Sequence, residues 1–93
     1  MTDFKDLASK LISYSELIIA TCAPGGKFAG REYKASSIHG GPGTSFSFNL
    51  DTNKWADFAT GEKGGDIISY FAKANNINNG EAAKQLAEKY LNN

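Results

Sequence analysis

Basic and aromatic side chains occur together on the segments of this 93-residue chain that are predicted to form strands. Exposed aromatic rings can stack on unpaired bases while neighbouring cationic groups contact the phosphates. The residues that fit this chemistry are Arg31, Tyr33, Lys34, Lys54 and Lys63, with Tyr33 as the expected stacking partner. Together they predict a surface for single-stranded nucleic acid.

The same aromatic residues are also candidates for the hydrophobic core. A chain of this length has few large apolar side chains, and most of them are needed inside. We therefore expect at least three of the five strand aromatics to be buried, the five being Tyr33, Phe46, Phe48, Trp55 and Phe58. The basic residues are accordingly the stronger candidates for contact with nucleic acid.

A glycine-rich segment, residues 60–65, leads into a predicted helix that begins after Asp66. Free amides at the start of a helix attract anions, so this segment could hold a phosphate, with Lys63 as the local cation. However, the carboxylate of Asp66 would itself accept those amides and repel an anion. We therefore favour a structural cap over a phosphate site. The segment also lacks the Gly-Lys-Ser/Thr ending of a nucleotide-binding P-loop.

Cys22 and His39 are the only cysteine and the only histidine. One cysteine cannot form an internal disulfide, and a zinc site would need two further carboxylates. A Cys–His nucleophile is not expected, because His39 lies beyond a glycine-containing segment and no third residue is placed to orient it. The sequence also shows no carboxylate cluster suited to two magnesium ions. We therefore expect no enzymatic activity and no cofactor.

Composition and charge fit one globular domain, which we expect to span residues 1–93. The net charge is zero, whereas a dedicated duplex-DNA binder would show a clear basic excess. The longest apolar stretch, residues 17–20, is too short to cross a bilayer, and no secretion signal opens the chain. We therefore expect a cytoplasmic protein without a membrane partner.

Apolar periodicity predicts helices at both ends of the chain. Residues 3–22 place Phe4, Leu7, Ala8, Leu11 and Ile12 on one face, with Thr2 or Asp3 as the cap and a break near Ser13 and Ser15. Residues 66–74 predict a helix whose apolar side is Ile67, Ile68, Phe71 and Ala74. A final helix starts near Asn79 or Gly80, with an apolar face of Ala83, Leu86, Ala87, Tyr90 and Leu91.

The middle of the chain predicts strands. Residues 45–49 alternate polar and apolar side chains, and residues 54–58 follow them after a turn at Asp51-Thr52-Asn53. These two segments form a predicted hairpin, and residues 31–35 predict a further strand. Residues 40–43 and 60–65 are predicted as loops, the former a flexible one. The fold class is α+β, a small antiparallel sheet flanked by N- and C-terminal helices.

The run Trp55-Ala-Asp-Phe-Ala-Thr-Gly-Glu-Lys-Gly-Gly-Asp-Ile-Ile-Ser69 resembles the core signature of the zinc-ribbon-like domains that begin bacterial and phage DNA primases and primase–helicases. Two upstream pieces agree with it: Pro24–Lys27 with Gly30–Tyr33, and Gly43–Phe48. The resemblance covers roughly residues 17–90 and implies a zinc-ribbon fold.

In the zinc-bearing relatives, a Cys and a His precede the Ser-Phe strand, and two Cys flank the turn after the hairpin. In this sequence those positions are Ser36, His39, Asp57 and Thr60. Only the histidine remains, so the resemblance implies the fold without its metal. Another contact must then join the two loops, and we expect Trp55, Phe58, Phe46 and Phe48 to supply it.

The resemblance implies a non-catalytic module that binds a single-stranded DNA template, weakly at this net charge. The alternative is a protein–protein interaction module that reuses the fold to contact replication proteins. The surface decides between them. A strip that joins the basic residues of the strands favours DNA, whereas an exposed apolar patch favours a protein partner.

Overall fold

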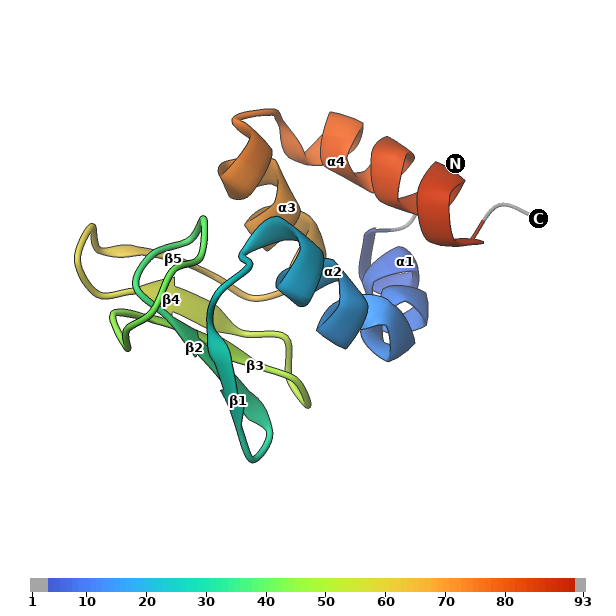
Figure 1. Cartoon of the computed structure of the whole chain (residues 1–93). Coiled ribbons are helices and arrows are strands. Elements are labelled where there is room, and N and C mark those ends of the chain that lie inside the picture. Colours follow the sequence, from blue (N-terminus) through green and yellow to red (C-terminus); the bar gives the residue numbers. More distant parts are fainter. Residues whose placement is uncertain (1–3, 92–93) are drawn as a thin grey trace.

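The computed structural model describes residues 4–91 and confirms the α+β class. Helical segments enclose the strands in sequence: helices come first, the strands follow, and helices end the chain. The helices are α1 (Phe4–Leu11), α2 (Ser15–Cys22), α3 (Ile67–Asn75) and α4 (Asn79–Leu86), with a 3₁₀ turn η1 (Ile12–Tyr14) and a π turn η2 (Ala87–Leu91). The strands are β1 (Lys27–Ala29), β2 (Glu32–Ala35), β3 (Phe46–Asn49), β4 (Trp55–Asp57) and β5 (Glu62–Gly64). The helices gather on one side of the sheet (Figure 1).

The five strands form an antiparallel meander in the order β1-β2-β3-β4-β5. Because successive side chains in a strand point to opposite faces, each strand contributes to two surfaces. Tyr33, Phe48 and Trp55 are paired across β2, β3 and β4 and are all buried. Their neighbours along the strands remain partly exposed. The sheet therefore has an inner face covered by helices and an open outer face.

Tyr70 on α3 is the centre of the aromatic core. Its ring contacts Phe46, Phe48 and Trp55 at centroid distances of 5.6, 5.9 and 6.0 Å. Burial raises the pKa of the Tyr70 phenol, and its hydroxyl donates a hydrogen bond of 2.8 Å to the Ile38 carbonyl. α3 is thereby fixed to the inner face of the sheet. Four of the five strand aromatics are buried, so the prediction of at least three is confirmed.

The helix starts follow the predicted chemistry where the structure describes them. The Asp66 carboxylate accepts the Ser69 amide at 2.7 Å and closes a capping box at α3. The structural cap is therefore confirmed over a free anion site. At α4 the Asn78 side chain accepts a single hydrogen bond from the Glu81 amide at 2.7 Å. The cap expected at Thr2 or Asp3 lies outside the described residues.

Two predicted helix faces need correction. Ile12 was placed on the buried face of the first helix, but it is 43% exposed. α1 ends at Leu11, and the tighter 3₁₀ turn that follows shifts the phase of the apolar pattern. On α3, Tyr70 and Ala72 are buried more deeply than the predicted Phe71 and Ala74. α3 contacts β5 as well as the three other α-helices, so its buried surface extends around most of the helix.

Two strands, β1 and β5, were not predicted from the sequence. Each has three residues and lies at an edge of the sheet. The segment 40–43, predicted to be a flexible loop, is tied down: the Gly41 amide donates to the Pro24 carbonyl at 2.8 Å, and the Ser36 amide donates to the Gly41 carbonyl at 3.0 Å. Within residues 4–91, no helix combines the length and the apolar character needed to cross a membrane.

Candidate nucleic-acid interface

Pairing across the sheet places three lysines in one row on the outer face. Lys27 is opposite Lys34, Lys34 is opposite Ser47, Ser47 is opposite Ala56, and Ala56 is opposite Lys63. Residues paired in this way share a face of the sheet. Strands lie about 4.8 Å apart, so Lys34 and Lys63 are separated by about 14 Å with only Ser47 and Ala56 between them. The row is therefore a shallow floor with cations at both ends.

Lys54 and Phe58 extend this surface along β4. They stand directly before Trp55 and after Asp57, which both point inward, so alternation directs them to the outer side. Both are exposed, Phe58 by 73%. We define the lysine face as Lys27, Lys34, Lys54, Lys63 and Phe58. With Glu32, which shares this side of β2, the face carries four lysines and one glutamate and hence a net charge of +3, although the whole chain is neutral.

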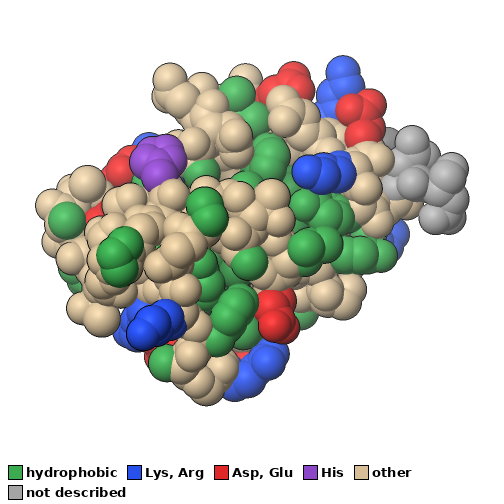
Figure 2. Space-filling model, viewed as in Figure 1, with side chains coloured by type: hydrophobic (Ala, Val, Ile, Leu, Met, Phe, Trp, Pro, Cys, Tyr) green, Lys and Arg blue, Asp and Glu red, His purple; other side chains and the backbone are tan. Residues whose placement is uncertain are grey.

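Three of the five predicted site residues, Lys34, Lys54 and Lys63, lie on the lysine face. Arg31 does not belong to the row: it occupies the β1–β2 turn, and its Nε pairs with Asp51 at 2.9 Å. Figure 2 shows basic side chains over the end of the molecule where β1 and β2 lie. Lys27, which sequence reasoning missed, joins the row because β1 pairs with β2.

Tyr33, predicted as the stacking residue, points the other way. It is 2% exposed, and its hydroxyl donates to the Ala23 carbonyl and accepts the Gly26 amide at 3.0 Å. The prediction was wrong because Tyr33 has the inward parity of β2, next to the outward Lys34. Its role is to fix the end of α2 to the start of β1. Phe58 is the exposed aromatic residue of the lysine face instead.

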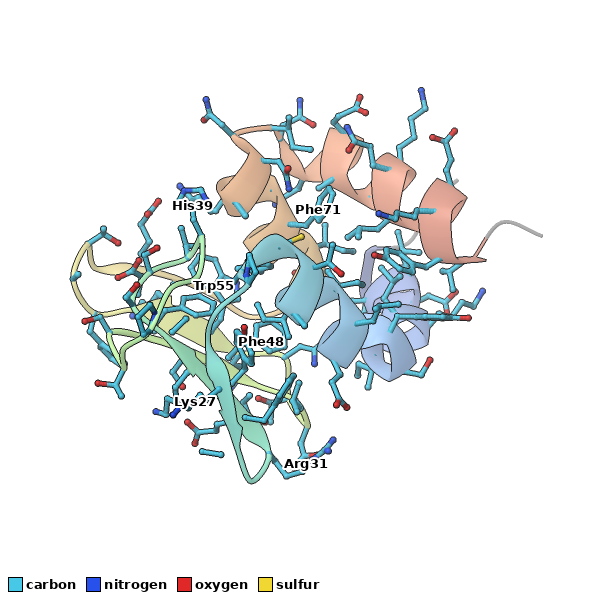
Figure 3. All side chains as sticks on the ribbon, in the orientation of Figure 1. Lys27, Arg31, His39, Phe48, Trp55 and Phe71 are labelled. Carbon is cyan, nitrogen blue, oxygen red and sulfur yellow. The ribbon has the colours of Figure 1, made fainter. Side chains whose placement is uncertain are left out.

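The four positions that hold zinc in the resembling domains lie on two loops that touch each other. His39 is exposed at the tip of the first loop (Figure 3), and Ser36 and Thr60 are also exposed. Asp57 alone is buried. Its carboxylate accepts the Ile38 amide at 3.2 Å and the Ala59 amide at 3.0 Å. Within residues 4–91 no group of three or more His, Cys, Asp or Glu side chains is arranged to hold a metal ion.

The predicted apolar replacement for the metal is thus only partly right. Phe46, Phe48 and Trp55 fill the core below the loops, and Figure 3 shows Phe48 and Trp55 between sheet and helices. Phe58 does not belong to this core, because it directly follows the inward-pointing Asp57 and therefore points outward. The direct link between the two loops is polar: the Asp57 carboxylate joins the first loop to the second.

Cys22 and His39 do not make an activated pair in this structure. Cys22 is half-buried at the end of α2, and burial raises the pKa of its thiol. A nucleophilic cysteine needs the opposite shift, toward the thiolate. His39 is exposed, and its backbone amide bonds to Ser37 Oγ at 3.1 Å. The structure therefore favours the lysine face over these two residues as the candidate functional site.

No protein-family model, curated protein or solved structure matches the chain. The lysine face and the chemistry of its side chains are therefore the features that bear on function.

Proposed function

We propose that the chain is a non-catalytic module that binds single-stranded nucleic acid, a DNA template in particular, through the lysine face. The observation that carries this proposal is the strand register that aligns Lys27, Lys34 and Lys63 on one open surface. Lysines separated by small side chains can contact the phosphates of a flexible nucleic-acid backbone that lies across the sheet. An exposed phenylalanine beside them supplies a stacking platform.

Phe58 favours an unpaired strand over a duplex. Bases within a duplex are already stacked on each other, and their faces are closed to an intruding side chain unless a step is opened. Bases of a single strand are free to lie on an aromatic ring. The modest net charge of +3 on the face predicts low affinity, since nucleic-acid affinity rises with the number of neutralised phosphates.

The resemblance to primase zinc-ribbon domains supports the same function. It rests on the run Trp55–Ser69, which forms β4, β5 and the start of α3. The proposal therefore places this chain among metal-free relatives of those domains, acting in the cytoplasm beside replication proteins. Primer synthesis on that template would belong to a separate catalytic domain.

Binding to single-stranded DNA is expected to weaken strongly with salt. Three or four lysines that reach phosphates give a slope of log affinity on log salt of about −2 to −3, at roughly −0.7 per contact. Fluorescence anisotropy of a labelled oligonucleotide across a salt series measures this slope. The double variant Lys34→Ala/Lys63→Ala should lose about half of it, whereas Lys84→Ala, a control that removes one charge from α4, should leave it unchanged. A salt-independent affinity contradicts the proposal.

Phe58→Ala is expected to weaken binding by about 1–3 kcal/mol, the contribution of one base stacked on an aromatic ring. The salt slope should stay the same, because the substitution removes no charge. Stability should also change little, since Phe58 is 73% exposed. Phe28→Ala is the control: Phe28 is 45% exposed but has the inward parity of β1 and packs on Tyr33 at 4.7 Å. Equal losses in both variants would assign no stacking role to Phe58.

The second candidate function is protein docking. Ile12 in η1 and Leu17 on α2 are 43% and 56% exposed. Large exposed apolar side chains are typical of contact surfaces when they form a patch. If the wild-type protein fails to bind DNA even at low salt, these two residues become the first positions to substitute in a search for a protein partner.

A further inference from the structure

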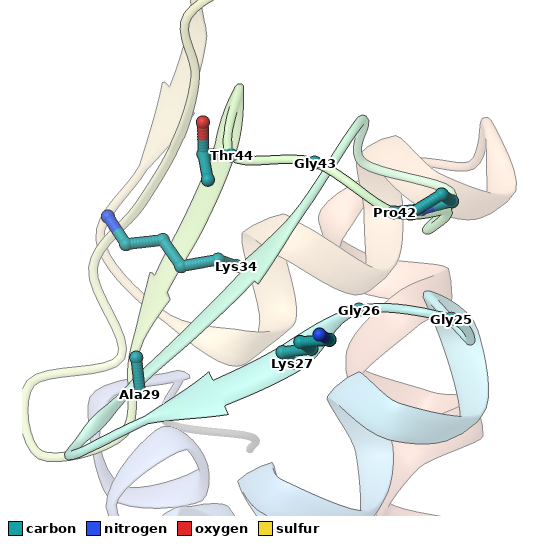
Figure 4. Close-up of a pocket in the computed structure, with 8 residues that line it drawn as sticks. All are labelled: Gly25, Gly26, Lys27, Ala29, Lys34, Pro42, Gly43 and Thr44. Carbon is teal, nitrogen blue, oxygen red and sulfur yellow. The ribbon is translucent and has the colours of Figure 1, made fainter.

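A pocket opens at the β1 end of the lysine face (Figure 4). It has a volume of about 360 Å³ and lies between the segment that starts β1 and the segment that starts β3. Its lining residues are Gly25, Gly26, Lys27, Ala29, Lys34, Pro42, Gly43 and Thr44. These described residues include two lysines and no acid. The volume is near the lower end of the range for small-molecule sites, about 300–1,000 Å³.

The wall of the pocket formed by Gly26 is fixed by contacts inside the protein. A side chain at Gly26 would lie 2.4 Å from the Lys34 carbonyl oxygen and 2.7 Å from the Tyr33 ring, so only glycine fits this close approach. The Tyr33 hydroxyl also accepts a hydrogen bond from the Gly26 amide at 3.0 Å. The backbone at this wall is therefore pre-formed, and a ligand would not have to order it.

The two pocket lysines are in different states. No ion pair holds Lys27 within residues 4–91, and the side chain is exposed. Lys34 Nζ instead pairs with Glu32 Oε1 at 3.0 Å, and Figure 4 shows its ammonium directed away from Gly26 and Pro42. Ser47 Oγ donates to the same Glu32 oxygen at 2.9 Å. These two hydrogen bonds hold the pKa of Glu32 below its usual value.

We infer that this pocket receives one phosphate group of the bound strand, and that Glu32 competes with that phosphate for Lys34. The inference rests on the proposed function. Lys27 provides the cation that is available in the free protein. Lys34 becomes the second cation once its ammonium leaves Glu32 and turns toward the pocket, while Ser47 keeps a hydrogen bond to the released carboxylate.

The position of the pocket fits this role. It lies at one end of the row that runs through Ser47 and Ala56 to Lys63. A strand that follows the row therefore reaches the pocket either with an internal phosphate or with a terminal one. Both present non-bridging phosphate oxygens to the two ammonium groups, and the terminal phosphate carries one more such oxygen and a larger negative charge.

The test compares variants of the full chain in binding to one labelled oligonucleotide. Lys27→Ala removes the free cation and should weaken binding roughly five- to tenfold at about 50 mM salt, with the slope reduced by about 0.7. Ala29→Leu fills the pocket without changing any charge, and Ala29 is exposed, so the fold should persist. This variant should weaken binding at least threefold. Lys84→Ala is the charge-matched control and should bind like wild type.

Glu32→Gln separates competition from support. If Glu32 competes for Lys34, this variant should bind roughly two- to fivefold more tightly, the range expected for release of one exposed ion pair. Equal or weaker binding overturns the competition. Oligonucleotides with and without a 5′-phosphate identify the source: an advantage for the phosphorylated strand that disappears in Ala29→Leu assigns the pocket to the terminus. No such advantage, with Lys27→Ala and Ala29→Leu still weakened, assigns it to an internal phosphate.

The outcomes for the two proposals are distinguishable. If wild type binds DNA and Lys27→Ala weakens binding, but Ala29→Leu binds like Lys84→Ala, the pocket is not a phosphate site, although the lysine face still stands. If wild type does not bind DNA at low salt, both proposals are overturned.

Discussion

Replacing Trp55 with alanine is expected to lower the free energy of unfolding by about 3–5 kcal/mol, the typical loss for truncating a buried tryptophan. Trp55 is 3% exposed and packs on Phe46 and Tyr70 at centroid distances of 6.2 and 6.0 Å. Its indole Nε1–H also donates to Ser69 Oγ at 3.0 Å. The side chain thus joins β4 to the capped start of α3, and its loss leaves both a cavity and a missing hydrogen bond.

Urea denaturation followed by far-ultraviolet circular dichroism measures this effect. Trp55→Phe keeps an aromatic ring in the core but removes the indole N–H, so it should lose only about 1–2 kcal/mol. A loss below about 1 kcal/mol for Trp55→Ala would mean that this side chain is exposed in solution and would contradict the buried position. Small domains have few kcal/mol in reserve, so the alanine variant is expected to be partly unfolded at 37 °C.

The helices and the central hairpin could be predicted because their signals are local. Apolar spacing of 3.6 residues identifies the segments around Leu11 and Leu86, and strict alternation identifies Phe46 and Phe48 on β3. The turn at Asp51–Asn53 also carries suitable residues: Asn49 Oδ1 accepts the Asp51 and Thr52 amides, each at 2.9 Å. Asn53 takes a positive φ of 62°, which asparagine tolerates better than most residues.

The edge strands could not be predicted because their own residues do not favour strand. β5 consists of Glu62, Lys63 and Gly64, none of which is a strong strand former. Its conformation is set by pairing with β4 and by a close approach to Trp55. A side chain at Gly64 would lie 2.5 Å from Trp55 Nε1. The glycine that looked like part of a phosphate loop is therefore a packing residue, and this role depends on tertiary contacts.

Only part of the candidate site could be predicted from the sequence, for a related reason. Composition identifies lysines near strands, but only the register decides which of them share a face. Lys27 joins the row because β1 pairs with β2. Tyr33, expected to stack on bases, points into the core, and Phe58, expected in the core, points outward. In β4 the order Trp-Ala-Asp does not alternate apolar and polar side chains, so it gives no signal that Phe58 points outward, whereas the alternation in β2 does favour an inward Tyr33.

The link that Asp57 makes between the two loops gives the second large effect. Asp57→Asn is expected to lower the free energy of unfolding by about 2–3 kcal/mol. The buried carboxylate accepts amides from both loops, Ile38 on one side and Ala59 on the other. An asparagine offers one carbonyl oxygen and one amide group, so one of the two backbone N–H groups would face another donor and remain without an acceptor.

Asp51→Asn is the matched control for the same chemical change on the surface. Asp51 pairs with Arg31, and both side chains are 61% exposed, so this substitution should alter stability by less than about 1 kcal/mol. Amide hydrogen exchange gives a second measure: in Asp57→Asn the amides of Ile38 and Ala59 should exchange faster before the core amides of β3 do. If both asparagine variants are equally stable, Asp57 does not join the loops. The first loop would then be held by other contacts, among them the hydrogen bond that the Tyr70 hydroxyl donates to the Ile38 carbonyl from the core side.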